Sequence, residues 1–313
     1  MRKLVVSRLA LAVPQLVIVA FVVFSMTYLV PGSPAAAILG ASATPESIRQ
    51  VEAQLGLDRP AFERLIDWAW NALNGDLGVS FVTTLPVTDM LLQRMPATLS
   101  LTVGGMVVAL ALGIGLGVLS AVRAGLPDRV IGAATSVGLS IPEFWFGMIL
   151  LLVFAVELGW VPVVAYVPLT DDPLAWLRGM ILPSIALGIG AAALIARQTR
   201  GAMVEALASP YVDTLTAAGV SRRRIVLRYA LKNAMVPVLA TTGLTFRILI
   251  GTSFVVEQIF AFPGAGRLLL TSVIGKDFPV VQGGVIVIAA LVIALNLLID
   301  VSYGLLNPKV RPQ

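Results

Sequence analysis

The stretch SPYVDTLTAAGVSRRRIVLRYALKNAMVP, residues 209–237, lies between two long apolar runs and decides how the chain is interpreted. Ser209 followed by proline is typical of a helix start, and Gly219 is typical of a left-handed helix end. Tyr211 and Leu215 share one apolar face of the enclosed helix with the alanine three residues later. Because so short a helix is marginal in water, we expect it to pack against its own bundle or another protein.

A second amphipathic segment follows the glycine. Ser221 is a candidate helix cap, and cations recur every four residues at Arg224, Arg228 and Lys232. One interpretation is a basic ridge at the inner membrane surface, where each cation gains about 1 kcal/mol from anionic head groups. The compact order of helix, glycine and helix is also suited to insertion into a groove of a partner.

The composition indicates a polytopic membrane protein. The chain is 58% hydrophobic and 12% charged with a mean hydropathy of +0.94, whereas soluble domains carry about 25% charged residues. It contains no His and no Cys, which removes the usual zinc, haem and iron–sulfur ligands and the common nucleophile–base pairs. We therefore predict no catalytic residue and no metal site. We expect the net charge of +5 to mark cytoplasmic loops rather than nucleic-acid binding.

Six apolar runs are long enough to cross a bilayer, which takes about 20 residues of helix. They are Leu9 to Val30, Thr98 to Val122, Ile131 to Leu158, Met180 to Ala196, Val238 to Phe260 and Gly283 to Leu305. Pro142 is expected to kink the third run, so that its first part could form a separate helix at the cytoplasmic face.

Lys and Arg residues predict the orientation, because cationic loops resist translocation. Fourteen of them lie on the side of the N-terminus and seven on the other side. Both termini are therefore expected in the cytoplasm, and residues 31–97 form an external segment between an N-terminal tail with the first span (1–30) and a core domain (98–313). The cytoplasmic loop of the core covers about 197–237.

The external segment is predicted to contain two helices. The first begins after Thr44 and ends at Gly56, and the second carries an apolar stripe of five residues, which are Phe62, Leu65, Ile66, Ala69 and Leu73. This module could receive a partner protein or form a lid on its own bundle. A rival interpretation makes the first span a cleavable signal peptide, with residues 35–37 as the cleavage site, but the run is longer than the usual core of about 7–15 residues.

Small residues recur at four-residue intervals in the second and fourth spans. They are Ala109, Gly113 and Gly117, and Ser184, Gly188, Ala192 and Ala196. We interpret them as close helix packing within the chain.

Two charged residues in the fifth span are candidates for the transport pathway or a gate. Arg247 lies well inside the span, where a cation costs at least about 2.5–3.5 kcal/mol, so it should face the bundle or a wet cavity. Its alternative role is a structural ion pair. Glu257 lies near the external end of the same span, and Glu143 is expected at the cytoplasmic boundary.

The chain carries no phosphate-binding loop. The pattern G-x-x-x-x-G-K-[ST] is absent, and the Gly275-Lys276 pair continues with Asp277. A membrane protein with a docking helix but no motor of its own indicates that a separate ATPase supplies the energy.

Short motifs in the same order resemble the permease subunits of binding-protein-dependent ABC importers, of the DppB/OppB type. These motifs are Pro31-Gly32-Ser33-Pro34, Leu55-Gly56-Leu57-Asp58-Arg59-Pro60, Gly75-Asp76-Leu77-Gly78, Arg94-Met95-Pro96-Ala97-Thr98-Leu99, Ser140-Ile141-Pro142-Glu143-Phe144-Trp145, Phe262-Pro263-Gly264-Ala265-Gly266-Arg267 and Phe278-Pro279-Val280-Val281-Gln282-Gly283. The segment around Gly219 resembles the EAA loop of that family, although Asp213-Thr214-Leu215 replaces Glu-Ala-Ala.

The resemblance implies an all-α, type I ABC importer permease fold in a bacterial inner membrane, with six transmembrane helices. It implies half of a pore that pairs with a homologous second permease, two ATPases that use ATP and Mg, and an external solute-binding protein that delivers peptides. This chain itself needs no cofactor. The residues expected to couple it to the ATPase are Tyr211, Val212, Asp213, Thr214, Leu215, Ala218 and Gly219.

Three alternatives to a peptide importer remain open at this point. The same permease role could serve nickel chelates or another small solute. An ion-coupled secondary transporter would use Arg247 and Glu257 as coupling charges. A membrane scaffold would only assemble partners.

Overall fold

The computed structural model describes residues 2–29, 32–162 and 166–306. Within these ranges the chain is helical, apart from turns and one isolated bridge between Val79 and Pro86. Val30 at the end of the first expected span, Pro31 of the first motif, and the cations Lys309 and Arg311 lie outside the described residues. Contacts divide the chain into a first unit of residues 1–96 and 264–301 and a second unit centred on 97–263, and each is described by itself.

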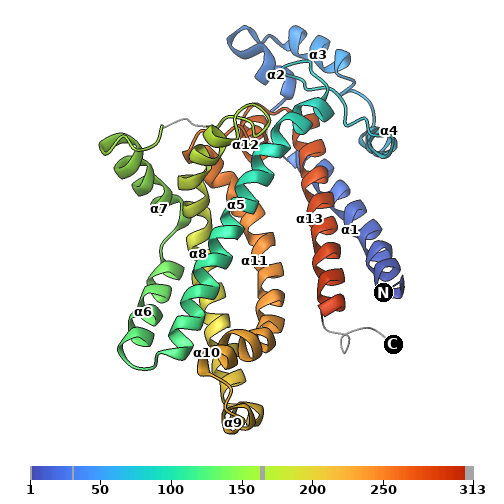
Figure 1. The fold of residues 1–313 in the computed structure, drawn as a ribbon. Helices are drawn as coiled ribbons and strands as arrows, with labels where there is room; N and C mark the ends of the chain where they lie inside the picture. Colours follow the sequence, from blue (N-terminus) through green and yellow to red (C-terminus); the bar gives the residue numbers. More distant parts are fainter. Residues whose placement is uncertain (1, 30–31, 163–165, 307–313) are drawn as a thin grey trace. The chain divides into compact units, whose positions relative to one another are not determined.

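The first unit combines the N-terminal span, the short helices that follow it and the C-terminal span (Figure 1). Its helices are α1 (Arg2–Leu29), α2 (Pro34–Leu39), η1 (Gly40–Ser42), α3 (Pro45–Gln54), α4 (Ala61–Leu73), α12 (Ala265–Ile274) and α13 (Phe278–Leu306). The sequence predicted α3 and α4 but not α2, whose first turn is capped by the side chain of Ser33. Thr44 caps α3 as predicted, through a reciprocal box with Ser47 in which Ser47 N donates to Thr44 Oγ1 at 3.2 Å.

A buried carboxylate fastens the loop before α5 to the turn before α13. Ser80 Oγ donates to Asp277 Oδ2 at 2.5 Å, and Phe81 N donates to Asp277 Oδ1 at 2.9 Å. Both polar side chains are buried, next to an apolar cluster that includes Leu77 and Val280. A buried charge is stable only when its acceptor sites are bonded, so this contact fixes the loop to the second half of the unit.

The second unit is built around α8. Its helices are α5 (Val87–Val122, whose first turns belong to the first unit), α6 (Leu126–Ser140), α7 (Glu143–Leu150), the π-helix η2 (Leu151–Glu157), α8 (Pro173–Leu207), α9 (Pro210–Ala217), α10 (Arg222–Arg224), the π-helix η3 (Ile225–Ala230) and α11 (Leu231–Ile259). The apolar part of α8 is 72% buried, against 33% for the corresponding part of α11. The apolar core joins α8 to α5, α7 and α11 through residues such as Leu101, Leu187 and Leu249.

Small residues bring the backbones of α5 and α8 into direct contact, as the four-residue spacing predicted. A Cβ atom built on Gly188 would lie 2.5 Å from Gly105 O, and one built on Gly117 would lie 2.7 Å from Ala196 O. Real Cβ atoms essentially never approach a backbone oxygen so closely. The seam between α5 and α8 therefore depends on glycine for room.

Five helices are long and apolar enough to span a membrane, and a sixth span results if one bent pair is counted. The bent pair is α6 with α7 and η2, and the axes turn by 100° at the break. The break falls at Ile141 and Pro142, where the sequence predicted a kink. The expectation of six spans is met in this form.

Candidate functional site

The helix α9 occupies the position that the sequence assigned to it. Ser209 lies in extended backbone before the helix, and Asp213 is in the first turn. The Ser209 side chain does not cap the helix, however, because its hydroxyl donates backward to Glu205 O at 3.1 Å. The extended backbone at Ser209 and the following proline thus mark the start, without a capping bond from the side chain.

Gly219 ends α9 in a Schellman motif. Its φ is +77°, Val220 N donates to Leu215 O at 3.0 Å, and Gly219 N donates to Thr216 O at 3.0 Å. This pair of bonds needs a residue in the left-handed region, which glycine adopts without strain. A Cβ atom on Gly219 would meet nothing within 4 Å, so the backbone alone requires glycine here and the surface around it is open.

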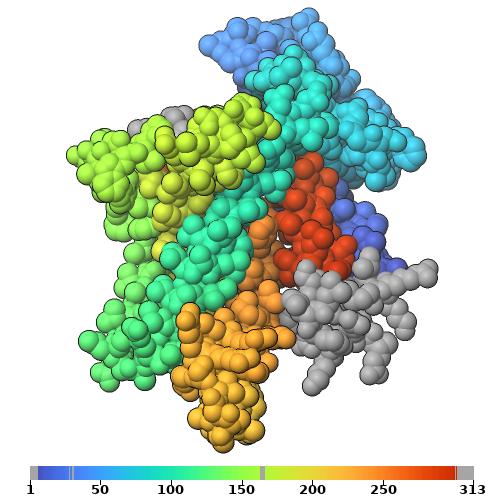
Figure 2. Space-filling view, viewed as in Figure 1, coloured from blue at the N-terminus to red at the C-terminus, as the bar shows by residue number. Residues whose placement is uncertain are grey.

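One face of α9 packs on the chain and the other is open. Val212 is buried, and Tyr211 and Leu215 are half-buried. The open face is formed by small and polar residues, which are Asp213, Thr214, Thr216, Ala217, Ala218 and Gly219. Ala218, which the sequence places on the same stripe as Tyr211 and Leu215, is exposed in this chain, and the buried residue is Val212. Figure 2 shows α9 as a projecting tip of the second unit.

The ends of three long helices pack together next to the start of α9. Ala202, Met203 and Ala206 of α8 pack against Val226 and Ala230 of η3. Val118 and Ala121 at the end of α5 complete this cluster. Protein interiors transmit displacement because they are close-packed. The end of α8 that leads into α9 is therefore coupled by packing to the end of α5 and to η3, which continues into α11.

The predicted basic ridge is exposed, but its register differs from an α-helix. Arg224, Arg228 and Lys232 are all exposed. Between the first and the last of them the backbone is the π-helix η3, in which bonds span five residues instead of four. Because the turn is wider, successive cations of the ridge point in directions that differ from those in an α-helix. The four-residue spacing in the sequence does not distinguish the two kinds of helix.

An ion pair that sequence reasoning missed lies near the same ends of α5 and α8. Arg200 Nε donates to Asp128 Oδ1 at 2.6 Å, and a second nitrogen donates to Asp128 Oδ2 at 2.7 Å. Ser120 Oγ donates to the same carboxylate at 2.5 Å. This bidentate arrangement joins α5, α6 and α8. Arg200 follows Asp128 by 72 residues in the sequence, so no local spacing could have predicted the pair.

Arg247 lies near the middle of α11 on an open face. The exposed residues in the middle of this helix recur at helical spacing, and they are Ala240, Leu244, Arg247, Ile248, Gly251 and Val255. No hydrogen bond or ion pair joins Arg247 to another residue in the described part of the chain. The alternative of a structural ion pair within this chain is thus not realised there. A cation at this depth cannot face lipid cheaply, so the open face of α11 needs protein or water against it.

The two carboxylates of the spans are held differently from expectation. Glu257 is fully buried and accepts a bond from Thr98 Oγ1 at 2.6 Å. Glu143 begins α7, lies 3.4 Å from the position of a Cβ on Gly190 in the middle of α8, and interacts with the Thr252 side chain. The break at Pro142 makes Glu143 the first residue of α7 and brings it against the middle of α8.

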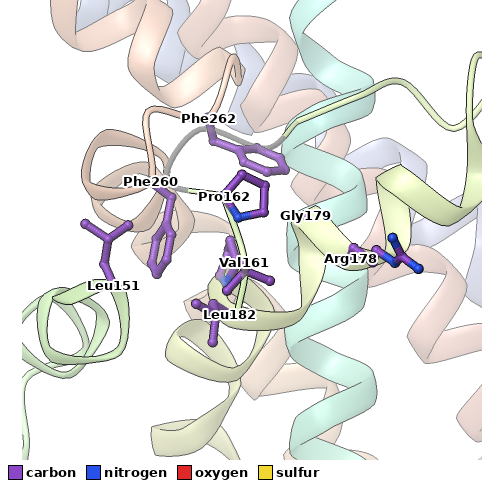
Figure 3. A pocket seen from close by; sticks show the side chains of 9 residues that line it. Leu151, Val161, Pro162, Arg178, Gly179, Leu182, Phe260 and Phe262 are labelled. Atoms are coloured by element: carbon purple, nitrogen blue, oxygen red, sulfur yellow. The ribbon is translucent and has the colours of Figure 1, made fainter. Parts of the chain in front are cut away.

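The second unit has no room for a solute near the end of α11. Phe260, Phe262, Val161 and Pro162 pack together there, while the Arg178 side chain extends away from them (Figure 3). The cavity among them measures only about 10 Å³, which is barely enough for one water molecule. Within the described residues, moreover, no three acidic side chains gather to hold a metal ion.

The comparisons with known proteins cover the whole chain. Residues 113–312 match the family model of the binding-protein-dependent transport system inner membrane component, and residues 1–102, which include α1, match its N-terminal companion. A putative peptide transport system permease protein of Brucella abortus is 39% identical over 312 residues, with 99% of each chain covered. A glutathione transport system permease protein of Escherichia coli strain K12 is 41% identical over 308 residues, with 98% of each chain covered.

A solved structure supports the same fold. The inward-facing MetNI methionine ABC transporter matches with a TM-score of 0.57 at 20% identity, covering 70% of this chain and 96% of that one. A likeness at this identity bears on the fold alone, and it confirms the expected importer permease fold. The chain therefore belongs to the family of inner-membrane permease components of binding-protein-dependent ABC importers, of the DppB/OppB type, and is a multi-pass transport subunit rather than an enzyme.

Proposed function

We propose that α9 and Gly219 form the coupling helix through which this permease receives movement from a partner ATPase. The observation that carries the proposal is the division of α9 into a packed face around Val212 and an open face around Ala218. The open face has small side chains, which allow a groove to close over the helix. The chain enters α9 from the end of α8, which packs against the ends of α5 and α11. An element built in this way can both receive and transmit a displacement.

The open face of α11 is proposed to line the pore. Family membership implies a second permease, and an exposed Arg247 in mid-span supports an assembly in which protein or water covers this face. In that position the guanidinium attracts the carboxylate of a passing solute. Glu257 is proposed to stabilise the closed external end through its bond to Thr98, rather than to contact the solute.

The substrate is proposed to be a peptide, delivered by an external solute-binding protein. The support is that the relatives are named for peptide and glutathione transport. Nickel chelates or another small solute are the remaining candidates. ATP and Mg would be used by two partner ATPases. Both chain ends and α9 are proposed to lie in the cytoplasm, because the cations gather on that side. The cations of the basic ridge would then face anionic lipid.

Cysteine crosslinking tests the coupling proposal, and the absence of native cysteine makes every single-cysteine variant specific. Thr214→Cys and Ala218→Cys place a thiol on the open face of α9, while Ala133→Cys places one on the exposed surface of α6 as the matched control. We expect the two α9 thiols to crosslink to the co-purified ATPase and the α6 thiol not to. Equal labelling of all three by a water-soluble maleimide in the assembled transporter would contradict the proposal.

A further inference from the structure

The external helix α4 exposes a line of large apolar side chains. Phe62, Ile66, Trp70 and Leu73 are 71%, 52%, 68% and 83% exposed, respectively. Their spacing of four, four and three residues places them along one side of the helix. A soluble surface carries such side chains singly, whereas a continuous line of four marks a contact surface.

The rest of α4 is divided into two other sides. The inner side, with Leu65, Trp68 and Ala72, is half-buried, and the rings of Trp68 and Phe24 of α1 lie 6.5 Å apart. The third side carries Glu63 and Asp67. At 100° per residue, Trp70 lies at the border between the apolar line and the acidic side.

The acidic side of α4 carries exposed ion pairs with Arg59. Arg59 lies 2.7 Å from Asp67 and 3.6 Å from Glu63, and all three side chains are more than half exposed. These two carboxylates raise the pKa of Arg59. Moving charged groups out of water is costly, so this side of the helix favours the aqueous phase.

The exposed apolar surface of α1 ends beside α4. Only 17% of the apolar window of α1 is buried, and Phe21, Met26 and Leu29 near its end are exposed. The ring of Phe24 in the same stretch contacts Trp68 of α4. Figure 1 shows α4 near the end of α1 that is opposite to the N-terminus. The apolar line therefore lies on a helix that adjoins the end of an exposed apolar span, on a different side of α4 from the one that contacts α1.

We propose that α4 is a membrane-surface helix whose line Phe62, Ile66, Trp70 and Leu73 is inserted into the adjacent lipid leaflet. An amphipathic helix with an aromatic at the border of its apolar side is typical of the bilayer interface. The alternative of a lid on the chain's own bundle leaves this line uncovered. A protein partner is disfavoured because the line is a narrow convex strip on a helix that adjoins the end of an exposed apolar span. Insertion of α4 would fix the distance between the external segment and the bilayer surface.

Spin labels at single cysteines test this placement. Ile66→Cys and Leu73→Cys label the apolar line, and Glu63→Cys and Asn71→Cys are matched controls on the same helix, one turn or less away. The full chain, with its co-purifying subunits, is reconstituted in vesicles of phosphatidylethanolamine and phosphatidylglycerol. Collision with oxygen, which concentrates in lipid, is compared with collision with a water-soluble nickel chelate.

We expect oxygen to reach the labels at 66 and 73 several-fold more readily than nickel does, and the reverse at 63 and 71. Equal access of nickel to all four labels would overturn the proposal, since the apolar line would then face water. Low access of both reagents at 66 and 73 would also overturn it, because a protein would then cover the line. Thermal unfolding of each labelled variant, which should match that of the parent chain, excludes a folding defect.

Discussion

Replacing Gly219 separates the backbone requirement of the α9 terminus from its contact with a partner. The residue is held at a φ of +77° by two bonds, from Gly219 N to Thr216 O and from Val220 N to Leu215 O. An L-residue in the left-handed region costs roughly 1–2 kcal/mol, but Asn pays less because its short polar side chain bonds locally. No atom lies within 4 Å of the added Cβ, so steric repulsion inside this chain adds nothing.

The three variants Gly219→Asn, Gly219→Ala and Gly219→Val should therefore differ in order between two assays. Hydrogen exchange at the Val220 amide reports the end of α9 alone, and there the disturbance should rise from Asn through Ala to Val. With about 1.4 kcal/mol for a factor of ten, Ala should raise exchange by roughly five- to thirty-fold. ATP-driven uptake reports the assembled transporter, where the size of the side chain at position 219 matters. The loss of uptake should therefore be smallest for Ala, larger for Asn and largest for Val.

The Asn variant decides the interpretation. We expect a nearly intact helix end together with a loss of coupling, in which ATP hydrolysis continues without matching uptake. Gly56→Ala is the matched control, because Gly56 has a φ of +63° and ends α3 with the same pair of backbone bonds, but lies in the first unit. If Gly219→Asn transports like the parent chain, or if Gly56→Ala impairs uptake as strongly as Gly219→Ala, no ATPase covers Gly219 and the coupling proposal fails.

The remaining predictions concern the pore face and the packing of the second unit. Arg247→Ala should lower uptake while ATPase association is unchanged, and Arg247→Lys should retain part of the uptake; equal transport by all three chains would remove the residue from the pathway. Gly117→Ala should destabilise the protein by about 1–3 kcal/mol, because its Cβ would lie 2.7 Å from Ala196 O. In the control Gly115→Ala the added Cβ has nothing within 4 Å, so this change should be neutral or slightly stabilising in detergent melting curves. Similar melting of the two variants would refute the close approach of the helices. Asp128→Asn removes the bidentate acceptor of Arg200, so the first turn of α6 should exchange amide hydrogens faster, and an unchanged rate would show that the pair does not hold α6.

The sequence predicted the elements of this fold well where a signal lies within one helix. The apolar runs gave the spans, Pro142 gave the break, and Ser209 and Gly219 bracketed α9. Thr44 gave the start of α3. Each of these signals is local, because a cap, a proline or a run of apolar residues acts through its immediate neighbours.

Faces and pairings were harder to predict because they depend on what packs against each helix. On α9 the apolar stripe predicted from the sequence includes Ala218, which is exposed in this chain, while the residue that the structure buries is Val212. Phe62 and Leu73 were expected to share a stripe with Leu65, yet they are exposed and Leu65 is half-buried. Apolar character shows that a side chain avoids water, but lipid, a partner or the chain's own core satisfies it equally.

The glycine seam between α5 and α8 limits how this permease can move. Gly188 contacts Gly105 O and Gly117 contacts Ala196 O, so the two backbones touch where neither helix has a side chain. Sliding by a fraction of a turn would bring side chains of one helix into steric clash with the backbone of the other. The two helices can tilt as one stiff rod but resist shear along each other. Bending in the second unit is thereby left to breaks such as the one after Ser140. We therefore expect the conformational changes of this subunit to be hinge motions rather than shear between α5 and α8.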